Sequence, residues 1–183
     1  MRVIFCICFL LAAEALADDS VEQRIQQIWD LANSTKHAEA LERSIALTTE
    51  HPKSIPALYQ LYMIQERHGK ISDAKATVKR ALTLEPNDAK SCNYYALMLA
   101  NGPAETVISK TTFNAPPWDK IAALFLRATE LDPKYADAWY NLAVTRTILT
   151  PPNLQGAREA YKRAVELGVQ RDPVFEEQIQ WKP

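Results

Sequence analysis

Three prolines, Pro52, Pro86 and Pro133, each follow a stretch of similar design, and the first two lie 34 residues apart. Before each proline, apolar residues recur three or four positions apart, most regularly before Pro86 and least regularly before Pro52. A period near 34 residues is typical of stacked helix pairs, each of which is too small to bury its own apolar face. The sequence therefore predicts an all-α solenoid, a fold that usually presents a concave surface to a partner rather than performing chemistry.

The residues before the prolines indicate how the two helices of a pair would pack. Residues three and four apart lie on one face of a helix. Small residues on such a face let two helices approach closely, and large residues fill the space between them. The residues at these offsets are Ala40, Ser44 and Leu47 before Pro52, Ala74, Val78, Ala81 and Leu82 before Pro86, and Ile121, Phe125 and Ala128 before Pro133.

The composition agrees with a helical domain and excludes some partners. The chain has 183 residues, which corresponds to one or two domains. It has only 4 glycines, and most of its 11 prolines lie between helical stretches. Its 21 basic and 22 acidic residues give a net charge of -1, and no basic block stands out. We therefore expect neither nucleic-acid binding nor a polybasic membrane patch.

The first residues resemble a targeting segment. Met1 and Arg2 give a positive start, residues 3–13 form an unbroken apolar run, and small residues at positions 15 and 17 precede an acidic pair. This order is typical of a secretory signal peptide, so residues 1–17 are predicted to be removed after Ala17. The alternative is a membrane anchor, which needs about 20 apolar residues, but Glu14 interrupts the run. We expect no stable membrane span after cleavage.

After cleavage Cys92 would be the only cysteine, so no disulfide could form within the chain. Because it lies in an apolar helical stretch, Cys92 is predicted to be a buried small hydrophobe rather than a reactive thiol. A single free cysteine and a repeated helical core fit a small accessory protein of the cell envelope. The expected compartment is the periplasm, with the extracellular space as the alternative.

Four units follow the predicted signal peptide. The third is 13 residues longer than the period, because it contains an insertion near residues 102–117. The predicted organisation is a solenoid over residues 18–171, with units 21–54, 55–88, 89–135 and 136–171, and a C-terminal capping helix within 172–183.

The fourth unit carries the most specific motif. Its two helices contain a Trp-x2-Leu-Ala pattern and an Ala-x3-Tyr-x2-Ala pattern, and Leu-Asp-Pro closes the unit before it. These residues resemble the tetratricopeptide repeat, in a protein of exported bacterial type. The resemblance implies a right-handed superhelical α-solenoid of about four helix pairs, and binding of a protein or peptide in its concave groove. The residues of the motif are Trp139, Leu142, Ala143, Ala157, Tyr161 and Ala164, with Leu131, Asp132 and Pro133 before them.

In that family the first helix of each pair lines the concave face. Carried over by register, the resemblance implies the following groove residues: Ile25, Trp29, Tyr59, Met63, Arg67, Asn93, Tyr94, Leu97, Tyr140, Asn141 and Val144. Aromatic side chains in this set would supply large contact areas with polar tips. The alternative for each residue is packing against a neighbouring second helix, and the sequence leaves both open.

Two further segments are candidate contact surfaces. The insertion in the third unit contains Phe113, and Trp118 follows it as the first residue of the next predicted helix. The insertion either contacts a partner, through Phe113 and Trp118, or packs on the solenoid. The C-terminal segment begins with Asp172, a good N-cap, and Pro173, which suits the first helical position. We expect a helix from Asp172 to Lys182 that caps the solenoid, with docking of a partner as the alternative.

No catalytic or metal-binding motif occurs. The three histidines, His37, His51 and His68, have no second ligand at metal-binding spacing and fall near predicted turns or helix ends. No phosphate-binding loop or nucleophile motif occurs, so we expect neither an enzyme nor a cofactor. The predicted function is a non-catalytic scaffold or adaptor of the cell envelope. The alternative is a structural or self-associating subunit of a larger envelope complex, and the oligomeric state stays open.

Overall fold

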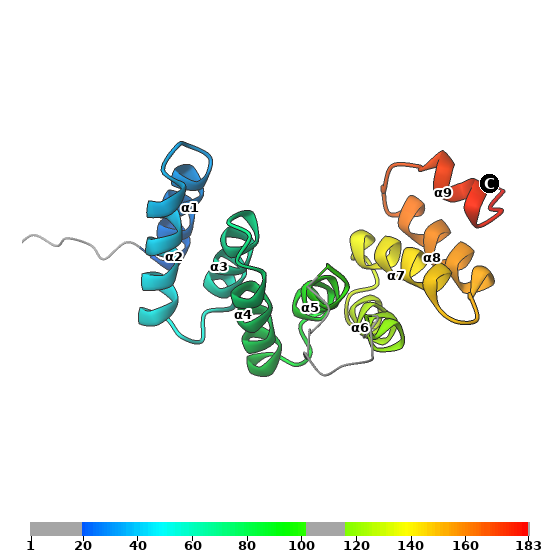
Figure 1. Cartoon of the computed structure of the whole chain (residues 1–183), viewed down its shortest axis with the longest axis horizontal. Helices are drawn as coiled ribbons and strands as arrows, with labels where there is room; N and C mark the ends of the chain where they lie inside the picture. The colour runs from blue at the N-terminus through cyan, green and yellow to red at the C-terminus, as the bar shows by residue number, and fades with distance from the viewer. Residues whose placement is uncertain (1–19, 102–115, 183) are drawn as a thin grey trace, which may run out of the picture.

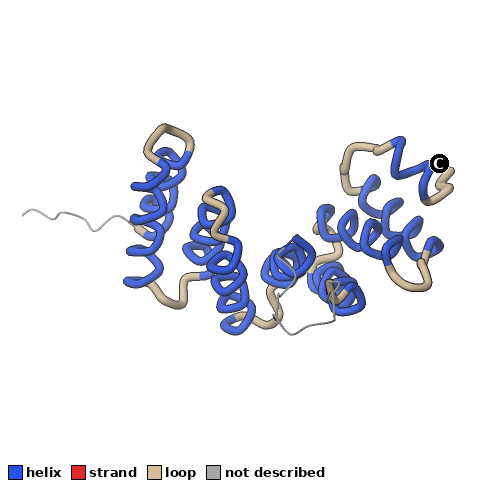
Figure 2. The backbone as a smooth tube through the Cα atoms, in the orientation of Figure 1, coloured by secondary structure: helices blue, strands red, loops and turns tan. Residues whose placement is uncertain are grey.

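The structure, a computed structural model, describes residues 20–101 and 116–182 (Figure 1). These residues form helices joined by short loops and contain no strand (Figure 2). The predicted signal peptide, most of the predicted insertion and Phe113 lie outside the described residues. The helices are α1 (Val21–Ala32), α2 (His37–Glu50), α3 (Ile55–Arg67), α4 (Ile71–Leu84), α5 (Ala89–Asn101), α6 (Trp118–Leu131), α7 (Ala136–Ile148), α8 (Leu154–Glu166) and α9 (Pro173–Gln178).

The helices stack as antiparallel pairs in chain order. From α1 to α8, each helix packs mainly on its neighbours along the chain, and α1 also contacts α3. The array is curved, with α3, α5 and α7 on its inner side and α4, α6 and α8 on its outer side (Figure 1). The predicted all-helical fold of stacked pairs is therefore confirmed.

The three prolines that set the sequence period stop three helices in the same way. Helices α2, α4 and α6 each end two residues before a proline, with one C-cap residue between. Because proline disfavours the helical conformation in the residue before it, Pro52, Pro86 and Pro133 fix where the second helix of each unit ends.

Gly69 forms the turn that follows α3, after the C-cap residue His68. Gly69 has a φ of +67°, a left-handed conformation that costs glycine little. The Gly69 amide donates to the Glu66 carbonyl, and the Lys70 amide donates to the Gln65 carbonyl. This Schellman arrangement satisfies the last carbonyls of α3 and reverses the chain into α4.

The core alternates small and large side chains, as the spacing predicted. Ala74 and Val78 of α4 are fully buried, as are Ala128 and Ile121 of α6. Cys92 is also buried, at 2% exposure, and burial raises the pKa of its thiol. The prediction that it is a buried hydrophobe is confirmed.

Helix α9 is shorter than predicted, since it ends at Gln178 instead of continuing to Lys182. Gln180 adopts a φ of 52°, and the Trp181 amide donates to the Glu176 carbonyl across a Schellman turn. The turn brings the Trp181 ring edge-on against Tyr161 of α8, with 5.3 Å between centroids. The chain therefore leaves the helical path at Gln180, and Trp181 packs on α8 instead of continuing α9.

A hydrogen-bonded group attaches α9 to the end of the solenoid. The Tyr161 hydroxyl accepts from the Asp172 amide at 2.7 Å and donates to Glu176 Oε1 at 2.9 Å. Arg171 donates to both carboxylate oxygens of Glu176, at 2.8 and 2.6 Å. Phe175 of α9 is buried beside them. These contacts show α9 covering the apolar end of α8, the capping arrangement.

The Glu176 carboxylate gives the stability of this end a pH dependence. Hydrogen bonds from Arg171 and then Tyr161 hold the pKa of Glu176 below its ordinary value of 4.5. Its contribution is therefore present above that value and is lost as the pH falls through the lower pKa of the folded state. Between about pH 5 and pH 3, the urea midpoint of the wild-type protein is expected to fall more steeply than that of Glu176→Gln. Parallel midpoint curves would contradict this role.

Candidate functional site

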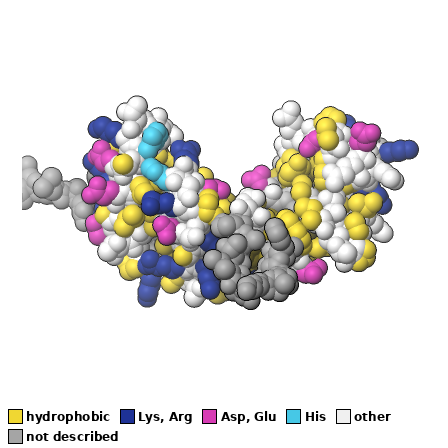
Figure 3. Space-filling view, in the orientation of Figure 1, with side chains coloured by type: hydrophobic (Ala, Val, Ile, Leu, Met, Phe, Trp, Pro, Cys, Tyr) yellow, Lys and Arg dark blue, Asp and Glu magenta, His cyan; other side chains and the backbone are white. Residues whose placement is uncertain are grey.

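The inner face of the curve is hollowed between α1–α4 and α7–α9 (Figure 3). Of the predicted groove residues, Asn93 is buried, Met63 and Arg67 are exposed, and the others are half-buried. None of Tyr59, Tyr94 and Tyr140 is fully buried between helices. These tyrosines thus keep part of their surface available to a partner.

A pocket of about 270 Å³ opens on this inner face, between α5, α7 and the loops that follow α6 and α8. It brings together five of the predicted groove residues with three that sequence reasoning missed. The missed residues are Tyr135, Asp137 and Val169. Asp137 lies three residues before Tyr140, so helical spacing alone could have placed it on the same face. The pocket is lined by Asn93, Tyr94, Leu97, Tyr135, Asp137, Tyr140, Asn141 and Val169.

Asn93 supports the pocket from within rather than offering a contact surface. Its side chain is 1% exposed. Its Nδ2 donates to the Tyr135 hydroxyl at 3.1 Å, and its Oδ1 accepts from Asn141 Nδ2 at 3.0 Å. This network joins α5 to α7 and fixes the side chains around the opening.

The phenol groups of the pocket stay neutral well above physiological pH. Burial is the main cause that raises the pKa of both Tyr94 and Tyr135. A hydrogen bond between the two hydroxyls lowers the pKa of Tyr94 and raises that of Tyr135, and the negative charge of Asp137 raises both. The pocket therefore carries a negative potential from Asp137 and hydroxyl groups that keep their protons.

A second aromatic group continues the inner face toward α3. The rings of Tyr59 and Tyr94 meet edge to face with 5.3 Å between their centroids. The ring centroid of Tyr62 lies 5.0 Å from that of Tyr94. The Tyr59 hydroxyl donates to the Asp88 carboxylate and lies 2.9 Å from the Ser91 hydroxyl. These contacts hold the Tyr59 ring in place across the joint between the second and third units.

At the N-terminal end, three predicted groove residues lie together. The Arg67 guanidinium stacks over the Trp29 ring at 5.2 Å and donates to Asn33 Oδ1 at 3.2 Å. Ile25 is half-buried, and its carbonyl accepts from Gln60 Nε2 at 2.6 Å. Arg67 is therefore engaged within the protein.

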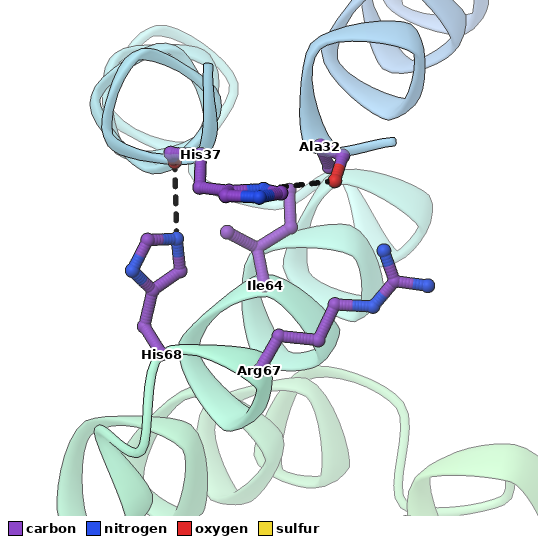
Figure 4. A pocket seen from close by; sticks show the side chains of 5 residues that line it. All are labelled: Ala32, His37, Ile64, Arg67 and His68. Carbon is purple, nitrogen blue, oxygen red and sulfur yellow. Dashed lines mark hydrogen bonds between the residues drawn. The ribbon is translucent and has the colours of Figure 1, made fainter. Parts of the chain in front are cut away.

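A separate pocket of about 240 Å³ lies where the first two units meet at their turns (Figure 4). His37 Nδ1 donates to the Ala32 carbonyl, and His68 Nε2 donates to the His37 carbonyl, both at 3.0 Å. The two rings lie 6.4 Å apart. That these two histidines lie together was not predicted from the sequence. They meet because His37 begins α2 and His68 follows α3, at the same end of the first two units. In the described part of the chain, no three His, Cys, Asp or Glu side chains are grouped to hold a metal ion.

Trp118 is the first residue of α6, as expected, and its half-buried ring packs against the core shared by the third and fourth units.

Across residues 20–101 and 116–182, no helix combines the length and apolar character needed to span a bilayer.

The fold and one repeat both match known proteins. Residues 124–155, from α6 to the start of α8, match the family model described as "Tetratricopeptide repeat". The chain therefore contains a tetratricopeptide repeat. A thermophilic tetratricopeptide-repeat protein from Thermus thermophilus superposes with a TM-score of 0.65 and 16% identity, over 87% of this chain and 79% of that one.

Other solved structures agree on the fold alone, since their identities are low. MamA from Desulfovibrio magneticus RS-1 gives a TM-score of 0.60 and 16% identity, covering 83% of this chain and 77% of that one. An O-GlcNAc transferase mutant from Thermobaculum terrenum gives 0.62 and 15% identity, covering 80% of this chain but 26% of that one.

Two curated relatives are much longer than this chain. Protein O-mannosyl-transferase TMTC3 of Homo sapiens is 28% identical over 164 residues, which is 87% of this chain and 17% of the relative. Protein O-mannosyl-transferase TMTC1 of Mus musculus is 27% identical over 146 residues, covering 78% of this chain and 14% of the relative. The chain thus spans less than a fifth of either relative.

Proposed function

We propose that this tetratricopeptide-repeat protein is a non-catalytic adaptor that holds a peptide, or an extended segment of a partner protein, in its concave groove. Tetratricopeptide repeats generally mediate protein–protein interaction, and the fold alone does not name a partner. The observation that carries the proposal is the pocket between α5 and α7, which opens on the inner face and is walled by partly exposed aromatic side chains.

The chemistry of the pocket suits an extended peptide. Tyr94, Leu97 and Tyr140 provide apolar surface for a side chain, and Asn141 provides polar atoms for peptide groups. The buried Asn93 fixes Asn141 before any ligand arrives. Because fewer side chains must be ordered on binding, this pre-organisation lowers the entropic cost of association.

The proposal also includes a location and an alternative. The signal-peptide pattern of residues 1–17 supports export, and we place the adaptor in the cell envelope, in the periplasm rather than outside the cell. The alternative is a structural subunit that associates with a second copy of itself. A dimer that forms with rising concentration and is abolished by blocking the groove would favour that alternative.

Blocking the pocket is the test of groove binding. Short random peptides would be selected against the protein by display, and the affinity of each selected peptide would be measured by fluorescence anisotropy. Val169→Trp places a bulky neutral ring in the pocket from a loop, so we expect affinities to fall about tenfold or more, equivalent to about 1.4 kcal/mol.

The matched control places the same ring on the opposite face. Leu126 is an exposed apolar residue of the outer helix α6, so Leu126→Trp is expected to leave affinities unchanged. Circular dichroism would confirm that both variants keep their helices. Equal affinities for wild type and Val169→Trp would move the binding surface away from the pocket and contradict the proposal.

A further inference from the structure

Three carboxylates lie along the aromatic part of the inner face, and they differ in what they contact. Asp88 accepts hydrogen bonds from the Tyr59 hydroxyl and the Ser91 amide. Asp172 caps α9 and accepts from the Tyr140 hydroxyl at 3.2 Å. Asp137 lines the pocket and is exposed, and within the described residues its carboxylate makes no hydrogen bond or ion pair. Asp137 is therefore the carboxylate that remains available to a ligand.

The walls of the pocket contain no positive charge to neutralise Asp137. The lining residues among those described include no lysine, arginine or histidine. Lys90, on α5, is exposed and lies outside the lining, as does Lys134. Arg171, at the C-terminal end, is paired with Glu176 and stacked over Trp181 at 5.2 Å.

The aromatic walls favour the same kind of ligand as the carboxylate. The face of a tyrosine ring is negative, so it attracts a cation placed over it. Three tyrosines, Tyr94, Tyr135 and Tyr140, line this one pocket together with Asp137. Burial is the main cause that raises the pKa of Tyr94 and Tyr135, and the negative charge of Asp137 raises both further.

We propose that this pocket accepts an arginine side chain of a basic peptide segment in a partner protein, with the guanidinium stacked on a tyrosine ring and paired with Asp137. This inference rests on the proposed groove function and names the chemistry of its ligand. Arginine fits better than lysine because its planar guanidinium stacks on aromatic rings, bonds a carboxylate through two N–H groups and is more weakly hydrated.

An ordinary structural role for Asp137 can be separated from this one. Asp137 lies in the first turn of α7, where a negative charge stabilises the helix dipole. Asp119 occupies the first turn of α6, is also exposed, and does not line the pocket. Asp119→Asn therefore removes the same charge from an equivalent helix position and is the matched control for Asp137→Asn.

The experiment measures fluorescence anisotropy of a fluorescein-labelled peptide of repeated Gly-Ser-Arg units, and of the same peptide with citrulline in place of arginine. Citrulline keeps the shape of arginine but has no charge. We expect the purified protein to bind the arginine peptide about tenfold more tightly. We expect Asp137→Asn to remove most of that difference, and Asp119→Asn to preserve it.

Two results would overturn the inference, and they leave the groove function intact. One is equal affinity for the arginine and citrulline peptides while display-selected peptides still depend on an unblocked pocket. The other is an equal loss with Asp119→Asn and Asp137→Asn, which would indicate attraction by overall charge. If display-selected peptides bind Val169→Trp as well as wild type, the groove function itself fails.

Discussion

Tyr161→Ala is expected to lower the free energy of unfolding by about 3–5 kcal/mol, the usual range for removing a large buried aromatic ring. The side chain is 0% exposed, and its ring contacts Tyr140, Phe175 and Trp181. Its removal leaves a cavity between α7, α8 and the C-terminal turn. Urea denaturation followed by circular dichroism would measure the loss, and hydrogen exchange would show earlier opening of α9.

Tyr161→Phe separates packing from hydrogen bonding at the same position. It keeps the ring but removes the acceptor of the Asp172 amide and the donor to Glu176. Leaving buried polar groups without partners costs about 1–3 kcal/mol, so this variant is expected to be intermediate. If Tyr161→Ala and Tyr161→Phe lower the free energy of unfolding equally, the packing of the Tyr161 ring is not what holds α9 on the end of the solenoid.

Phe125→Ala is expected to cost a similar amount, about 3–5 kcal/mol, in the core shared by the third and fourth units. Phe125 is 2% exposed and belongs to the same cluster as Ile121 and Leu142. Because each helix packs mainly on its neighbours, the loss should be concentrated in α5–α8. Urea denaturation would give its size, and hydrogen exchange would give its location.

The neighbouring residue provides the control. Leu126 follows Phe125 on the same helix but is 39% exposed. Leu126→Ala is expected to change stability by less than about 0.5 kcal/mol, as is usual for surface substitutions. Comparable losses for the two variants would mean that α6 presents a different face to the core.

Periodicity was sufficient to predict most of this fold. The proline spacing and the small–large patterns reflect local helix geometry. Each helix pair buries the same kind of apolar face against its neighbours, so the pattern recurs along the chain. Phe125 and Ala128 were predicted as core residues from spacing alone, and both are buried. Trp118 was expected to open a helix after the insertion, and it is the first residue of α6.

The site was predictable only in part, because it depends on contacts between units. Register placed Tyr94 and Tyr140 on the inner face, but it could not show that Asn93 turns inward to join Tyr135. Tyr135 precedes its helix, so helical periodicity does not reach it. The end of α9 was missed because the left-handed turn at Gln180 accompanies the contact of Trp181 with Tyr161 of α8, and helical spacing does not report such a tertiary contact.

The neighbour-to-neighbour packing of the helices also has a mechanical consequence. The first two units join the rest of the array chiefly through α4 and α5, with the Tyr59 contacts to Asp88 and Ser91 at the same joint. The pocket lies entirely on the C-terminal side of that joint. A small tilt at the joint between α4 and α5 would displace α1 and α2 more than α3 and α4, because α1 and α2 lie farther from the joint. Such a tilt would change the width of the hollow on the inner face without altering the lining of the pocket (Figure 3).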